Sequence, residues 1–86
     1  MRKVTIHERS IPTVGELYEL CAEAGETVSV VFHRSGRRDI GIRPPNRDSV
    51  TVSVTLTHAE ALALAGVLVG AFVDVEIEDD EEPIVA

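Results

Sequence analysis

The feature that most constrains this sequence is a strictly alternating segment that runs directly into a capped apolar helix. Over residues 49–56, apolar and hydroxyl side chains alternate one by one, which is the pattern of a β-strand with one face on a core. Thr57 and Glu60 then have the spacing of a capping box, in which each side chain accepts a hydrogen bond from the other residue's backbone N–H. We therefore predict a strand over 49–56 and a helix over 58–69 packed on the sheet.

The helix lies within an uncharged apolar run over residues 61–73. This run is shorter than the ~18–20 residues needed to cross a bilayer, so we predict a buried helix and no transmembrane segment. The overall composition, 44% hydrophobic and 27% charged, is typical of a folded soluble domain.

Further strand patterns surround this unit. Gly36 is placed for a tight hairpin between two of them, and residues 44–48 contain two prolines and form a loop. Apolar alternation or continuity marks the other expected strands, at residues 2–8, 27–32, 38–43 and 73–78. The predicted fold class is α+β, a small antiparallel sheet of about five or six strands with one helix. We expect a single domain over residues 1–78, followed by an acidic, flexible tail over 79–86.

The segment 13–25 is open to two interpretations. Thr13 and Glu16 have the spacing of a second capping box, and apolar side chains follow at helical intervals. Gly25 suits the C-terminal cap of a helix and a hairpin turn equally well. From the residues alone, a helix is favoured here.

The charge is unevenly distributed. Eight Lys and Arg residues stand against fifteen Asp and Glu residues, a net charge of −7, and seven of the acids lie within residues 74–82. This balance argues against a nucleic-acid partner, which is bound largely through Lys and Arg. The positive charge is concentrated on one expected hairpin, which carries His33, Arg34, Arg37 and Arg38.

We interpret these four residues as a candidate partner-binding site, because the arginine fork binds carboxylate or phosphate in a bidentate manner. The site would suit an acidic protein surface or an anionic lipid head group. The alternative is an exposed turn whose charges pair with Asp39, Asp48 or the acidic tail.

No catalytic constellation is visible in the sequence. The three histidines are far apart along the chain, and the single Cys21 can form neither an internal disulfide nor a zinc cluster. We predict no enzyme activity, no catalytic residue, no cofactor-binding residue and no metal site. A single free cysteine and the lack of an apolar leader at the N-terminus indicate a cytoplasmic protein.

A series of short motifs carries a family resemblance. It comprises Gly15-Glu16-Leu17-Tyr18-Glu19-Leu20, then Gly25, then residues 28–40 ending in His33-Arg34-Ser35-Gly36-Arg37-Arg38-Asp39-Ile40, flanked by Ile11-Pro12-Thr13-Val14-Gly15 and Leu56-Thr57-His58-Ala59-Glu60-Ala61. The series resembles the N-terminal domain of the KhtT-type regulatory subunits of bacterial cation:proton (potassium/proton) antiporters. Their C-terminal ligand-sensing domain, of the RCK or TrkA C-terminal type, has no counterpart within the 86 residues.

The resemblance implies that residues 16–23 form a strand paired with 27–33, against the local helix signal. It also implies a non-catalytic cytoplasmic regulatory protein at the inner face of the membrane. Its partner would be the cytoplasmic face of a monovalent cation:proton antiporter, or a related regulatory subunit. We further expect a homo-oligomer, a dimer being favoured. The contrasting hypothesis is a stand-alone oligomerisation or small-ligand-binding module unrelated to transport.

Overall fold

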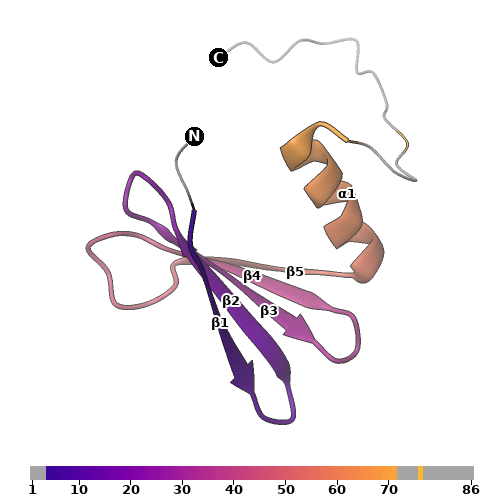
Figure 1. Cartoon of the computed structure of the whole chain (residues 1–86), viewed down its shortest axis with the longest axis horizontal. Coiled ribbons are helices and arrows are strands. Elements are labelled where there is room, and N and C mark those ends of the chain that lie inside the picture. The colour runs from indigo at the N-terminus through magenta and orange to yellow at the C-terminus, as the bar shows by residue number, and fades with distance from the viewer. Residues whose placement is uncertain (1–3, 72–75, 77–86) are drawn as a thin grey trace.

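The computed structural model describes residues 4–71 and residue 76, and shows an antiparallel sheet with one helix (Figure 1). The elements are β1 (Ile6–Ile11), β2 (Gly15–Cys21), β3 (Thr27–His33), β4 (Arg38–Arg43), β5 (Val52–Leu56) and α1 (His58–Val69). Each strand pairs with the next along the chain, so the sheet is a simple meander in the order β1-β2-β3-β4-β5. The predicted α+β class is confirmed.

The conflict over residues 13–25 is resolved in favour of a strand. β2 pairs with β1 on one side and with β3 on the other, so ladder hydrogen bonds replace those of a helix. Thr13, the expected helix cap, has a φ of 67°, whereas a capping residue has extended backbone. The local helix prediction is therefore wrong, and the strand implied by the family resemblance is confirmed, with bounds Gly15–Cys21.

Gly15 is a position that only glycine can occupy. It is buried at the start of β2, and a Cβ atom there would overlap the carbonyl oxygen of Phe32 on β3. This close approach places the β1–β2 turn directly beside the β3–β4 hairpin.

The bounds of β1 and β5 differ most from the sequence prediction. β1 runs from Ile6 to Ile11, whereas the predicted range is 2–8. It extends to Ile11 because the short turn that follows places Ile11 opposite Gly15, so that the whole of β1 pairs with β2. β5 begins at Val52 and not at residue 49, although the Thr51 N–H still donates to the Ile42 carbonyl at 3.0 Å. The predicted strand 73–78, apart from residue 76, and the acidic tail lie outside the described residues.

α1 has the predicted bounds and the predicted caps. The Glu60 N–H donates to Thr57 Oγ1 at 3.2 Å, and the Thr57 N–H donates to Glu60 Oε1 at 2.9 Å. Gly70 closes the helix in the left-handed conformation, with a φ of 72°.

The strand register sorts the side chains into two faces, because directly paired residues project to the same side of a sheet. One face, which we call the apolar face, is mostly apolar and carries Ile6, Tyr18, Leu20, Val28, Val30, Phe32, Ile40, Ile42, Val52, Val54 and Leu56. Its polar members are Glu8 on the β1 edge and Ser10, Glu16 and Arg38 at the end of the sheet nearest the β3–β4 hairpin. The other, the polar face, carries His7, Arg9, Glu19, Ser29, His33, Asp39, Ser53 and Thr55, interrupted by Leu17 and Val31.

α1 meets the sheet at β5, the strand from which it starts, and then rises away from the sheet (Figure 1). Its first turn lies on the side of the apolar face, because His58 contacts Arg38, which shares that face. No large apolar side chain among the described residues is buried. Val52 remains 59% exposed and Leu68 on α1 remains 75% exposed. Within the described residues, most apolar side chains of the strands therefore share one face, and the burial predicted for the helix is not found, because α1 contacts the sheet only at β5.

Candidate functional site

The hairpin between β3 and β4 carries the four predicted site residues and is tightly built. The His33 N–H donates to the Arg37 carbonyl at 2.9 Å, and the Gly36 N–H donates back to the His33 carbonyl at 2.9 Å. Gly36 has a φ of 96°, as expected of the glycine that closes a three-residue hairpin loop. The loop therefore presents Arg34 at its tip and returns the chain at Arg37.

A second turn supports this hairpin from the side. The Arg34 N–H donates to the Val14 carbonyl at 3.1 Å, which ties the β3–β4 hairpin to the β1–β2 turn. Together with the close approach at Gly15, this contact holds the tip in a defined position on the sheet.

On the polar face, Asp39 is the centre of a hydrogen-bond cluster. His33 Nε2 lies 2.6 Å from Asp39 Oδ2, and because an ionised carboxylate only accepts, this ring nitrogen is the donor. Thr55 Oγ1 donates to Asp39 Oδ1 at 2.7 Å, and Arg37 Nε lies 3.8 Å from the same oxygen. The cluster joins three segments of the sheet: the hairpin, β4 and β5.

These partners favour the charged form of Asp39. The hydrogen bond from Thr55 does most to lower the pKa of its carboxyl, followed by the hydrogen bond from His33, with a smaller contribution from the charge of Arg37. Asp39 is therefore an anion at neutral pH, and it orients His33 and Arg37 while leaving the Arg37 side chain 53% exposed.

Arg38 lies on the opposite side of the sheet, because successive strand residues point to opposite faces. Its guanidinium carbon stacks 3.3 Å above the centroid of the Phe32 ring, a cation–π contact. Nη1 donates to the Gly36 carbonyl, and Nη2 lies 3.2 Å from His58 Nδ1 in the first turn of α1. Arg38 thus links the hairpin to the helix.

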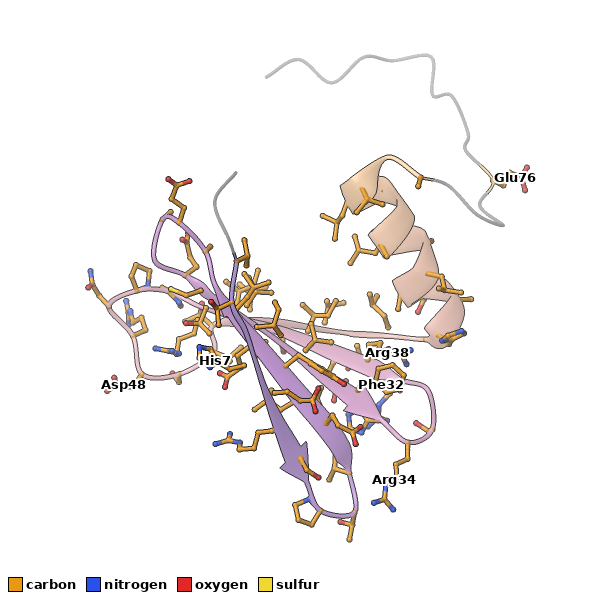
Figure 2. The ribbon with its side chains drawn as sticks, in the orientation of Figure 1. His7, Phe32, Arg34, Arg38, Asp48 and Glu76 are labelled. Atoms are coloured by element: carbon orange, nitrogen blue, oxygen red, sulfur yellow. The ribbon has the colours of Figure 1, made fainter. Side chains whose placement is uncertain are left out.

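The four predicted residues are therefore divided into three positions, and Figure 2 labels Arg34 and Arg38 among them. His33 and Arg37 gather around Asp39 on the polar face, and Arg38 lies beside Phe32 on the side from which α1 rises. Arg34 projects from the tip into solvent, and no interaction engages its guanidinium group within the described part of the chain.

Sequence reasoning missed three members of this region: Phe32, Thr55 and His58. Thr55 has a signal in the sequence, because it occupies a polar position of an alternating strand and such positions share the face of polar neighbours. Phe32 and His58 have none, since only the fold brings both to Arg38. The expected pairing of the hairpin arginines with Asp39 is found for Arg37.

A shallow apolar hollow lies at the other end of the sheet. Its lining is Ile6, Tyr18, Glu19, Leu20, Val28 and Val30, mostly residues of the apolar face. The pKa of Tyr18 is raised by desolvation and by the nearby carboxylates of Glu8 and Glu16. The phenol is therefore neutral at physiological pH and closes one side of the hollow.

Metal-binding and membrane-spanning features are both absent from the described residues, 4–71 and 76. These residues contain no group of three or more His, Cys, Asp or Glu side chains that could hold a metal ion. None of the helical structure in this same part of the chain is long and apolar enough to cross a membrane.

These features describe a small α+β domain with an open sheet, an exposed cationic hairpin and uncovered apolar surface. Residues 4–72 match the family model of the K⁺/H⁺ antiporter subunit KhtT, N-terminal domain, and the chain belongs to that family. The resemblance seen in the hairpin and strand motifs is thereby confirmed. A comparison with curated proteins finds no match.

Proposed function

We propose that this protein is a non-catalytic regulatory component of a monovalent cation:proton antiporter. The observation that carries the proposal is the family match, because it covers residues 4–72 and the family is described as an antiporter subunit. In this proposal the protein acts in the cytoplasm, at the inner face of the membrane. It binds the cytoplasmic surface of the antiporter, or a related regulatory subunit, as a homodimer.

The docking contact is the tip of the β3–β4 hairpin, and its target is an acidic segment of the antiporter. Arg34 and Arg37 both expose guanidinium groups there, and each can bind a carboxylate through two parallel hydrogen bonds. The tip is held in place by the Val14 carbonyl, so little conformational freedom is lost on binding.

The other two residues of the predicted site support the tip. The Asp39 carboxylate lies 2.6 Å from His33 Nε2 and holds this ring beside Arg37. The position of the ring in turn orients the exposed Arg37 side chain. Arg38 couples the hairpin to the start of α1 through His58, which gives a path from a docked hairpin to the helix. Control of transport would then be steric or allosteric, exerted through residues 33–40.

Co-purification tests the proposal. The full chain is co-expressed with the monovalent cation:proton antiporters of its own genome, and retention on each detergent-solubilised antiporter is measured. The double variant Arg34→Ala/Arg37→Ala should reduce retention at least tenfold. The matched control is Arg9→Ala/Arg47→Ala, which removes the same charge from exposed positions outside the hairpin and should bind as the wild type does.

Two results would contradict the proposal. The first is full retention of the hairpin double variant on an antiporter that the wild-type chain binds. The second is equal binding to vesicles of anionic lipid with and without the antiporter, since that would make the lipid head group the target of the arginines.

A further inference from the structure

Within the described residues, two apolar surfaces, one on the sheet and one on α1, face solvent and do not cover each other. On the apolar face, the exposed fraction reaches 49% for Val54 and 59% for Val52, and Ile6 and Ile42 are also exposed. On α1 it reaches 75% for both Leu68 and Val69, and Leu62, Leu64 and Val67 are exposed as well.

Surfaces of both kinds are normally buried against another element or another protein. α1 has twelve residues, and isolated helices of this length are marginally stable at best. Its one acidic residue in the first turn is Glu60, and everything from Ala61 to Val69 is apolar or glycine, which is typical of a helix buried on all sides. An exposed apolar sheet face likewise marks an interaction surface.

The chain as folded keeps the two surfaces apart. β5 ends at Leu56 and α1 begins at His58, so a single residue, Thr57, connects them. Connections between a strand and the helix that packs back on it usually have 2–6 residues. The capping box fixes the backbone at Thr57, and the contact of His58 with Arg38 anchors the first turn, so α1 leaves the sheet at its β5 edge.

We infer that a second copy of this chain covers both surfaces, with α1 of each copy packed on the apolar face of the other. The dimensions fit: twelve helical residues span about 18 Å, and the axes of five strands span about 19 Å. Charge does not oppose this contact, since α1 has no charged residue after Glu60 and the charged residues of the apolar face, Glu8, Glu16 and Arg38, lie at its β1 edge and at its hairpin end. Each copy offers one helix and one face, so the exchange closes at two chains with two-fold symmetry.

This inference deepens the proposed function and rests on the homodimer that it contains. It uses none of the residues of the docking tip. The dimer that results carries two cationic hairpins, one per copy, and can therefore hold two equivalent acidic segments of an antiporter at once.

A mixing experiment tests the exchange. In the full chain, Val54→Glu blocks the apolar face and Leu68→Glu blocks the helix, while Ser53→Glu places the same charge on the polar face of the same strand as a control. Native mass spectrometry should show a dimer for the wild type and for Ser53→Glu, and monomers for each of the other two variants alone. An equal mixture of Val54→Glu and Leu68→Glu should give a 1:1 heterodimer, because the intact helix of the first fits the intact face of the second.

The outcomes separate the alternatives. A wild-type dimer without heterodimer from the mixture overturns the exchange and leaves the dimer, since helix–helix or face–face contacts cannot be rescued in this way. A monomeric wild-type chain at about 100 μM, many times the dissociation constant of a stable dimer, overturns both and leaves docking by the hairpin to its own test.

A second measurement uses only the wild-type chain, so it tests the inference even if either substitution prevents folding. Isotope-labelled and unlabelled wild-type chains are mixed, and nuclear Overhauser effects between the two copies are recorded. Contacts between leucine methyl groups of α1 and valine methyl groups of the apolar face should appear between copies. If the same contacts are found only within one copy, or if another segment or molecule covers the apolar face, the inference is wrong.

Discussion

The β3–β4 hairpin and the apolar side of the molecule are built in opposite ways. In the hairpin, nearly every polar group finds a partner close by: Asp39 binds His33 and Thr55, and Arg38 binds the Gly36 carbonyl and stacks on Phe32. On the apolar side, Val54 and Leu68 find no cover within the described part of their own chain. Hydrogen bonds form between near neighbours in a hairpin, whereas burying an apolar face needs a second layer of structure.

The largest effect is expected at Gly15, where the hairpin is packed against the neighbouring turn. Gly15→Ala should lower the free energy of unfolding by about 3 kcal/mol or more, because its Cβ would meet the Phe32 carbonyl at a positive φ. Urea unfolding measures this. Gly70→Ala is the control: its φ is also positive but the space around it is open, so about 1 kcal/mol is expected. Equal losses of stability at the two positions would show that close packing at Gly15 does not stabilise the hairpin.

The next effect tests the apolar side. Leu68→Ala should lower the free energy of unfolding by about 2 kcal/mol, because the side chain is buried once the second copy is bound. In an uncovered helix the same change should stay within about 0.5 kcal/mol. Thermal unfolding at several protein concentrations distinguishes a helix buried in a dimer from an uncovered helix, since the melting temperature of a dimer rises with protein concentration. Val50→Ala, which shortens an exposed side chain away from the apolar face, should stay near the lower figure.

The junction between the two regions comes third. Thr57→Ala removes the hydroxyl that accepts from the Glu60 N–H and should lower the free energy of unfolding by about 1 kcal/mol. Thr57→Ser keeps the hydroxyl and should differ little from the wild type. Helix content by circular dichroism, read beside the unfolding data, should fall for the alanine variant only; a matching loss in the serine variant would contradict the capping argument.

The smallest effect lies in the hairpin and depends on pH. The pKa of Asp39 is lower in the folded than in the unfolded chain, so its charge favours folding above the ordinary aspartate value of about 3.9 and this contribution is lost as the pH falls through the folded value. Asp39→Asn should therefore reduce the difference in stability between about pH 5 and about pH 2.

An NMR titration of the Asp39 carboxyl checks the cause of that shift. Thr55→Val should raise its pKa, since the hydrogen bond from Thr55 lowers it most, and Thr55→Ser should leave it low. An unchanged titration in Thr55→Val would show that the hairpin cluster does not depend on β5.

Most of the sheet could be predicted from local patterns. The alternation that marks β5, the continuous apolar residues of β3 and the glycine of the β3–β4 hairpin report directly on backbone shape. The segment 13–25 could not be predicted in this way, because its helical spacing competes with pairing to two neighbouring strands, and that pairing depends on residues far along the chain. The family resemblance supplied the missing information.

The candidate site shows the same division. The sequence places the four cationic residues on one hairpin, but strand alternation assigns Arg38 and Asp39 to opposite sides of the sheet, and this follows only once the bounds of β4 are known. Arg37, which precedes β4, is placed on the polar side by its contact with Asp39. The partners Thr55 and His58 come from β5 and α1. The alternation of residues 49–56 assigns Thr55 to a polar face, but that the hairpin lies beside Thr55 and His58 follows only from the fold.

By itself, the sequence determined the α+β class, the helix with both of its caps, and the concentration of positive charge at residues 33–38, because periodicity, capping and charge are local properties. Only the tertiary structure decided that Asp39 organises the polar side of the hairpin, that Arg38 reaches α1, and that the described part of the chain leaves Val52 and Val54 of the apolar face exposed. These depend on register and on the direction in which α1 leaves β5, and both are set by contacts between residues distant in the chain.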